Sequence, residues 1–266
     1  MHPRYDIRLP RSETSHLSQA EAFFHLIENN SATRLRFHDY GEIYRRPGLY
    51  EQLFYERLRC SSPAKALEVL GSVLKSNRAD IHELRVLDLG AGNGMVGELL
   101  HGARTVGVDI EQEARDACVR DRPGAYDAFY VTDLCASTHE LLEELRAWQF
   151  NCLACVAALG FGDIPVPAFA SAFNLIQPEG WIVFNIKETF LQERDNSGFS
   201  RLIKHMLMGD LLQVHHLERY RHRLSIDGAP LFYYMLCGRK MADIPAEITG
   251  RFAGGADMIG SVPVRR

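Results

Sequence analysis

Short apolar runs alternate with helical patterns through the middle of the chain. The runs lie at 84–89, 105–108, 126–131, 150–156 and 180–186, and patterns with helical spacing separate most of them, as at 111–120 and 138–148. Strands that alternate with helices predict a parallel sheet covered by helices on both faces. Because crossovers between parallel strands are right-handed, the sheet is expected to be open and doubly wound, which makes this an α/β protein.

The end of this region departs from the alternation. Two strand-like runs, 217–226 and 231–239, are joined by a short loop that contains Asp227-Gly228, a strong hairpin signal. We therefore expect an antiparallel hairpin to close an otherwise parallel sheet of seven strands.

The N-terminal part has a different pattern. Leu17, Ala20, Phe23, Phe24 and Ile27 recur at helical spacing and predict one amphipathic helix. An aromatic stretch at 40–55 follows, broken at Pro47-Gly48, and a second helix is expected to begin at Pro63. These patterns divide the chain into a helical N-terminal extension or lid (1–62), a main domain (63–240) and a C-terminal tail (241–266) without clear periodicity.

Composition narrows the class of protein. The 266 residues include 46% hydrophobic and 24% charged residues and carry a net charge of -4, which argues against general affinity for nucleic acid. No signal peptide and no apolar stretch of about 20 residues is visible, so no membrane span is expected. The six cysteines are scattered, as in a reduced, cytoplasmic protein. Cys152 and Cys155 fall three apart in an expected strand and should be buried thiols on opposite faces, so no metal site is predicted.

A glycine-rich loop follows the first strand of the alternating region. Residues 88–94 have the sequence Asp-Leu-Gly-Ala-Gly-Asn-Gly, and a helix is expected to begin at about Met95. Residues 92–97 match the dinucleotide pattern G-x-G-x-x-G, in which a helix N-terminus holds a pyrophosphate. Asp88 opposes that interpretation, because a carboxylate beside the loop repels phosphate but suits the ammonium group of a methionine moiety.

Two more acids follow the next two strands. Asp109 ends the second strand, where its carboxylate can accept hydrogen bonds from both hydroxyls of a ribose. Asp133 follows the third strand, where it can accept a hydrogen bond from an adenine amino group beside the Leu134 amide. Each acid alone can also serve as a helix or turn cap, and together they indicate an adenosine-containing ligand.

With these motifs, the segment 84–239 resembles the class I S-adenosylmethionine-dependent methyltransferases, which have a Rossmann-like sheet and a closing hairpin. The resemblance implies that the glycine loop wraps the methionine end of the cofactor, that S-adenosylhomocysteine is the product, and that Ile110 packs on the adenine. The cofactor-binding residues expected from it are Asp88, Gly90, Ala91, Gly92, Gly94, Asp109, Ile110, Asp133 and Leu134. The segment 86–97 particularly resembles small-molecule enzymes, including bacterial ones associated with tetratricopeptide repeats and the methyltransferase-like protein of the Williams–Beuren region. Residues 37–44 resemble the aromatic segment that covers the cofactor in such proteins.

The methyl acceptor is harder to predict. Residues 157–165 lack the Asn/Asp-Pro-Pro-Tyr sequence of enzymes that methylate amides and exocyclic amines, and no Pro-Cys motif for cytosine C5 is present. A small molecule is the expected acceptor, and no catalytic base is assigned. Two alternatives stay open: a non-catalytic methyltransferase-like subunit that binds or regulates a partner, and an NAD(P)-dependent oxidoreductase. The acceptor pocket is expected to include Tyr40, Tyr44, Phe161, Asp163 and Lys187.

Overall fold

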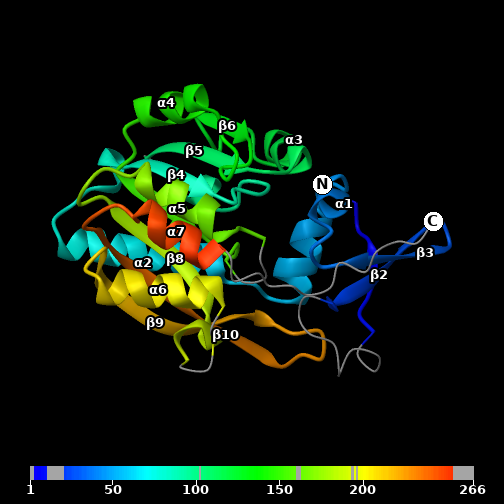
Figure 1. Ribbon diagram of the computed structural model, residues 1–266. Helices are drawn as coiled ribbons and strands as arrows, with labels where there is room; N and C mark the ends of the chain where they lie inside the picture. Colours follow the sequence, from blue (N-terminus) through cyan, green and yellow to red (C-terminus); the bar gives the residue numbers. More distant parts are fainter. Residues whose placement is uncertain are drawn as a thin grey trace, which may run out of the picture.

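A computed structural model describes residues 3–10, 21–101, 103–159, 163–192, 195 and 197–253. Its main feature is a seven-stranded sheet with the strand order β6-β5-β4-β7-β8-β10-β9. Strands β4 to β8 pair in parallel, and β10 pairs antiparallel with both β8 and β9. The predicted doubly wound sheet with a closing hairpin is confirmed (Figure 1). Its strands are β4 Arg85–Leu89, β5 Arg104–Asp109, β6 Ala128–Val131, β7 Cys152–Cys155, β8 Trp181–Lys187, β9 Leu212–Leu224 and β10 Pro230–Lys240.

Helices cover both faces of this sheet. One face packs against α2, and the opposite face packs against α4, α5, α6 and α7. The side chains of β7 show the alternation, because Cys152 joins the core under α2 and Cys155 joins the opposite core. Both are buried free thiols, as predicted. The helices are α2 Ser62–Ser76, α3 Gln112–Asp121, α4 His139–Ala147, α5 Val166–Asn174, α6 Gly198–Met208 and α7 Ala246–Ala253.

The N-terminal extension contains a small sheet where a helix was expected. Strands β1 (Asp6–Arg8), β2 (Phe23–Glu28) and β3 (Ser31–Arg36) form an antiparallel sheet, and the predicted helix is wrong over β2. Phe24 and Leu26 are buried at strand spacing, and a tight turn follows in which Asn29 and Asn30 have φ of 51° and 61°. Such a turn is typical of two-residue hairpins. The other residues of the predicted helix, Leu17 and Ala20, lie outside the described residues.

The rest of the extension is helical and packs on this sheet. The short helix α1 (Tyr40–Tyr44) precedes a π-helical segment, η2 (Glu51–Arg57), and Pro47-Gly48 separates the two as predicted. The extension has its own apolar core, which Ile226 of the β9–β10 loop joins. Figure 1 shows this region to one side of the large sheet, outside the helical layers.

One other expectation needs correction. The glycine loop leads into a short 3₁₀ turn, η4 (Gly97–Leu99), in place of a helix from Met95. The start of the C-terminal tail contains α7, whose Phe252 packs into the main core. Two further 3₁₀ turns are η3 Ile81–Glu83 and η5 Glu188–Leu191. Among the described helices, none has the length and apolar character needed to cross a bilayer.

Candidate active site

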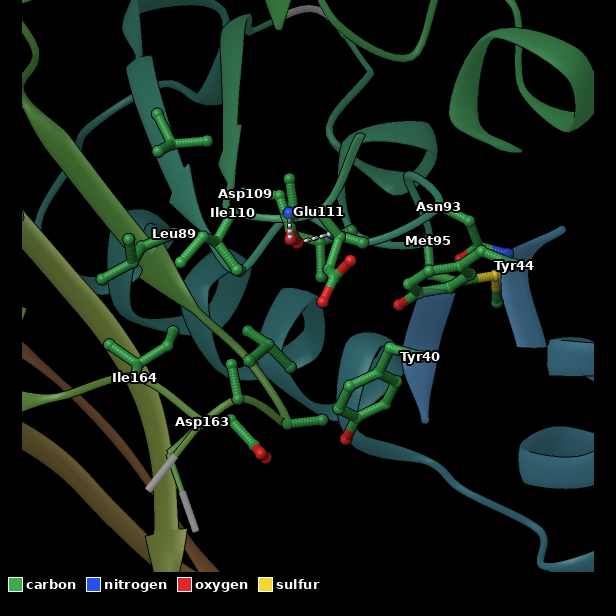
Figure 2. Close-up of a pocket in the computed structure, with 18 of the residues that line it drawn as sticks. Tyr40, Tyr44, Leu89, Asn93, Met95, Asp109, Ile110, Glu111, Asp163 and Ile164 are labelled. Atoms are coloured by element: carbon green, nitrogen blue, oxygen red, sulfur yellow. Dashed lines mark hydrogen bonds between the residues drawn. The ribbon is translucent and has the colours of Figure 1, made fainter. Parts of the chain in front are cut away.

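A cavity of about 240 Å³ lies at the carboxyl ends of β4, β5, β6 and β7. Ligands of open α/β sheets bind at this edge. Figure 2 shows side chains from the strand ends and from α1 around it. Most of the residues predicted from the sequence meet here. The predicted residues that line the cavity are Gly90, Ala91, Gly92, Asp109, Ile110, Asp133, Leu134, Tyr40, Tyr44 and Asp163.

Three predicted residues do not line this cavity, and a fourth, Phe161, lies outside the described residues. Lys187 ends β8 away from it, and the Gly94 backbone faces Cys118. Asp88 lies beneath the glycine loop with 1% of its surface exposed and accepts a hydrogen bond from Tyr126 Oη at 2.6 Å. Burial raises the pKa of its carboxyl to about 7. The side chain expected to face an ammonium group therefore supports the loop from below.

The glycine loop is folded tightly against the next strand. The amides of Gly90 and Ala91 both donate to Val108 O, at 2.9 and 3.1 Å. Gly92 has φ of +54°, and a Cβ on it would lie 2.6 Å from Tyr44 Oη. Only glycine fits this backbone and this close approach. Because the loop continues into a 3₁₀ turn, it lacks the helix N-terminus on which dinucleotide-binding proteins place a pyrophosphate.

Asp109 is held rigidly at the end of β5. Its Oδ2 accepts from the Gly92 amide at 2.8 Å, and its Oδ1 accepts from the Glu111 amide at 3.0 Å (Figure 2). Burial raises the pKa of this carboxyl, while the backbone donors oppose the shift. Each carboxylate oxygen has a second lone pair for a ligand hydroxyl. Asp109 therefore ties the glycine loop to the position expected for ribose.

The end of the cavity at which adenine is expected is formed by the residues after β5 and β6. Ile110 has 61% of its surface exposed although its side chain is large and apolar, which suits contact with a flat ring. Asp133 Oδ1 accepts from the Cys135 amide at 2.8 Å, so this acid also caps its own turn. The Thr132 amide donates to Asp109 O at 2.8 Å and joins the two strand ends.

A series of tyrosines from the extension covers the cavity. The ring centroids of Tyr40 and Tyr44 are 6.0 Å apart, and those of Tyr44 and Tyr50 are 5.1 Å apart. Burial raises the pKa of these phenols and of Tyr55, so all are neutral at pH 7. Tyr50 and Tyr55 were not singled out from the sequence, although they belong to the aromatic stretch at 40–55.

Polar contacts fasten this cover to the main domain. Asn93 of the glycine loop donates from Nδ2 to Glu51 Oε1 at 2.7 Å, and Arg122 pairs with the same carboxylate at 2.8 Å. Arg120 Nη2 donates to Tyr44 O at 3.1 Å. The cover therefore contacts the loop that it encloses. The sequence did not indicate these partners, because they lie in separate segments.

Beside Tyr40, the cavity wall carries His38, which lies in the aromatic segment 37–44 but was not itself singled out from the sequence. His38 Nδ1 lies 3.2 Å from Asp163 Oδ1, and both residues line the cavity. Beside them, the Ala157 amide after β7 donates to Asn185 Oδ1 at 2.6 Å. An imidazole next to a carboxylate can take up a proton, because the carboxylate stabilises the imidazolium that results. Among the described residues, no cluster of three or more His, Cys, Asp or Glu could hold a metal ion.

Comparison with known proteins finds a family match for the central segment of the chain. Residues 87–184 match the sequence profile of a family described as "Methyltransferase domain". No curated protein matches the chain. Solved structures resemble it at low identity. The N-methyltransferase NodS of Bradyrhizobium japonicum with S-adenosyl-L-homocysteine is 13% identical, over 77% of this chain and 97% of that one, with a TM-score of 0.48. The magnesium protoporphyrin IX methyltransferase of Synechocystis with bound S-adenosylmethionine is 12% identical, over 67% and 79%, with a TM-score of 0.46.

Proposed function

We propose that this protein transfers a methyl group from S-adenosylmethionine to a small molecule, because residues 87–184 match a methyltransferase-domain profile and lie within a doubly wound sheet. The observation that carries the proposal is a single cavity with two chemically different ends. Backbone amides and Asp109 form one end, and His38 with Asp163 forms the other. The first end suits an adenosine-containing donor, and the second suits an acceptor that must lose a proton.

The donor end uses residues of the main domain. The Asp109 carboxylate accepts from the ribose hydroxyls, and Ile110 packs on the adenine. Asp133 accepts from the adenine amino group beside the Leu134 amide. The backbone of Gly90, Ala91 and Gly92 forms the wall for the methionine portion. These assignments are supported by the common location of the residues at the carboxyl ends of β4, β5 and β6.

The acceptor end combines His38 of the extension with Asp163 of the main domain. When bound, S-adenosylmethionine supplies a methyl group on a positively charged sulfur. A lone pair of the acceptor attacks the methyl carbon in line, and the sulfur leaves. His38 takes the proton from the acceptor hydroxyl or amine, and Asp163 stabilises the charged imidazole. The tyrosine rings exclude water and place π-faces near the cation. Positioning supplies much of the rate, because the methyl carbon is already activated.

The proposal also assigns a role to each part of the chain. The extension at 1–62 acts as a lid with its own apolar core, and the domain at 63–240 binds the donor. The segment beyond 240 contributes α7 as a brace on α5 and α6. This division is supported by the location of Tyr40, Tyr44 and Tyr50, which reach the cavity from the extension.

Calorimetry with S-adenosylhomocysteine and, separately, NADH tests the donor assignment. We expect micromolar binding of S-adenosylhomocysteine and none of NADH. Binding of NADH alone would replace the proposal by an oxidoreductase function, and indifference to both would favour a non-catalytic subunit. A screen of metabolite extracts with a radiolabelled methyl donor then identifies acceptors, and absence of label from every fraction would contradict turnover.

A further inference from the structure

Arg223 near the end of β9 is a buried cation beside the acceptor end of the cavity. Only 5% of its surface is exposed, and it lines a small second cavity of about 30 Å³. His38, Tyr40, Tyr50 and Ala157 line both this cavity and the larger one, so the two adjoin. The small cavity has room for about two water molecules, or for one group of the size of a carboxylate.

A β-bulge explains why this arginine is buried. Arg221 pairs with Phe232 and Arg223 pairs with Leu231, so His222 is an extra residue in the register. As a result His222 and Arg223 are both buried, although neighbouring residues of a regular strand point to opposite faces. On a regular strand, the alternating residues Arg219, Arg221 and Arg223 would share one face. Arg219, before the bulge, is instead 46% exposed and pairs with Glu188 at 2.9 Å.

The charge of Arg223 is not balanced within the described part of the chain, where it forms no ion pair. Its Nη1 donates to Leu224 O at 2.9 Å, and its guanidinium lies 5.6 Å from the centroid of the Phe37 ring. Burial lowers the pKa of Arg223. A buried guanidinium without an anionic partner is costly, which is why such groups are normally paired.

The groups around Arg223 are neutral and can donate hydrogen bonds. Burial lowers the pKa of His222 to about 3, so its ring is uncharged, and its Nδ1 lies 2.6 Å from Ser62 Oγ. Tyr40 and Tyr233 also line the small cavity, and in the described part of the chain their hydroxyls form no hydrogen bond. Asp163, an acid that lines the larger cavity, lies against His38. One cation and two free hydroxyls therefore converge on a space for an oxyanion.

We propose that the methyl acceptor carries a carboxylate that binds Arg223 in this small cavity, while its nucleophilic hydroxyl or amine lies at His38 in the larger one. The inference rests on the proposed methyltransferase function and narrows its substrate class to acids. A guanidinium and a carboxylate match in geometry and can form two parallel hydrogen bonds. The aromatic rings of Phe37, Tyr50 and Phe54 indicate an apolar or aromatic body next to the acid.

Calorimetry on protein saturated with S-adenosylhomocysteine tests the inference, with benzoate and its uncharged isostere benzamide as probes. We expect benzoate to bind at least about tenfold more tightly than benzamide. Arg223→Gln should abolish this preference and Arg223→Lys should retain part of it. Arg221→Gln, on the exposed neighbour, should leave it intact. Arg223→Met should melt at the same temperature as the wild type or higher, because it removes an unpaired buried charge.

Each contrary outcome has a distinct meaning. A preference for benzoate that survives Arg223→Gln, no preference in the wild type, or a lower melting temperature of Arg223→Met would overturn the inference. Weaker binding of S-adenosylhomocysteine to Arg223→Gln would assign the arginine to the cofactor instead. Tighter binding of phenyl phosphate than of benzoate would replace the carboxylate by a phosphate. Failure of the wild type to bind S-adenosylhomocysteine at all would instead reject the proposed function.

Discussion

The two ends of the cavity are built in different ways. The donor end consists of residues at the ends of adjacent parallel strands, and backbone hydrogen bonds such as Gly92 N to Asp109 Oδ2 fix it. The acceptor end brings His38, Asp163 and Arg223 together from three distant segments, and their positions depend on side-chain packing. A wall made by the sheet itself is set by the fold, whereas a wall made by separate loops can differ between proteins with the same fold.

The difference also appears in the charges. Both carboxylates at the donor end that we assign to the cofactor, Asp109 and Asp133, already accept a hydrogen bond from a backbone amide. At the acceptor end, Arg223 has no anionic partner in the described part of the chain. A substitution at one end should therefore change the binding or chemistry of that end and leave the other end unchanged.

The largest effect confined to one end of the cavity is expected for His38→Ala. It removes the proton acceptor, so kcat with an acceptor from the labelled-donor screen should fall by about 100- to 1,000-fold. The dissociation constant of S-adenosylhomocysteine, measured by calorimetry, should stay within about twofold. His139→Ala, an 80% exposed histidine on α4, is the matched control and should change neither quantity. An unchanged kcat in His38→Ala would remove the base from the proposal.

Gly92→Ala should weaken cofactor binding at the donor end. The new Cβ would meet Tyr44 Oη at 2.6 Å in a backbone region that side chains rarely adopt, so affinity for S-adenosylhomocysteine should fall by about 100-fold. Gly124→Ala is the control, because Gly124 also has positive φ but its Cβ would meet nothing within 4 Å. It should cost about 1 kcal/mol of stability and no affinity. Adding Tyr44→Phe to Gly92→Ala should restore part of the binding, and equal affinities for the single and double variants would contradict this close approach.

Asp109→Asn should have a smaller effect at the same end. The amide keeps the shape of the side chain but loses the negative charge that strengthens the hydrogen bonds from the ribose hydroxyls and from the Gly92 amide. Affinity for S-adenosylhomocysteine should therefore fall by about 30-fold. Asp116→Asn on the exposed face of α3 should have no effect. Calorimetric affinities within a factor of two for Asp109→Asn and wild type would reject the ribose assignment.

The smallest effect on binding is expected for Asp88, whose substitution should change stability. Its pKa is about 7 in the folded chain and about 4 when unfolded, so folding takes up a proton between these values. The stabilisation is therefore complete below pH 4 and is lost as the pH rises through 7. Asp88→Asn should flatten the pH dependence of unfolding by urea by up to about 4 kcal/mol. A large loss of cofactor affinity in this variant would instead restore Asp88 as a ligand.

The N-terminal extension shows why some sequence predictions failed. Phe23, Phe24 and Ile27 fit a helical period, but the same segment also places Phe24 and Leu26 on one face of a strand. Short apolar segments satisfy both periods, and pairing with β1 and β3 decided between them. The Asn29-Asn30 turn was the local signal for a strand. In the same way, the loop after Gly94 contains no full helix, although it begins with a pattern that usually precedes one.

The amino-acid sequence alone predicted most residues of the cavity end that we assign to the donor, although Asp88 and Gly94 do not line it. Strand ends, glycines and acids lie close together along the chain, and the regular alternation of strands and helices brings them to one edge of the sheet. Only the tertiary structure showed which residues accompany the predicted Asp163 at the end that we assign to the acceptor. The pair of His38 with Asp163 and the bulge that buries Arg223 depend on contacts between segments far apart in sequence, and no local pattern encodes such contacts.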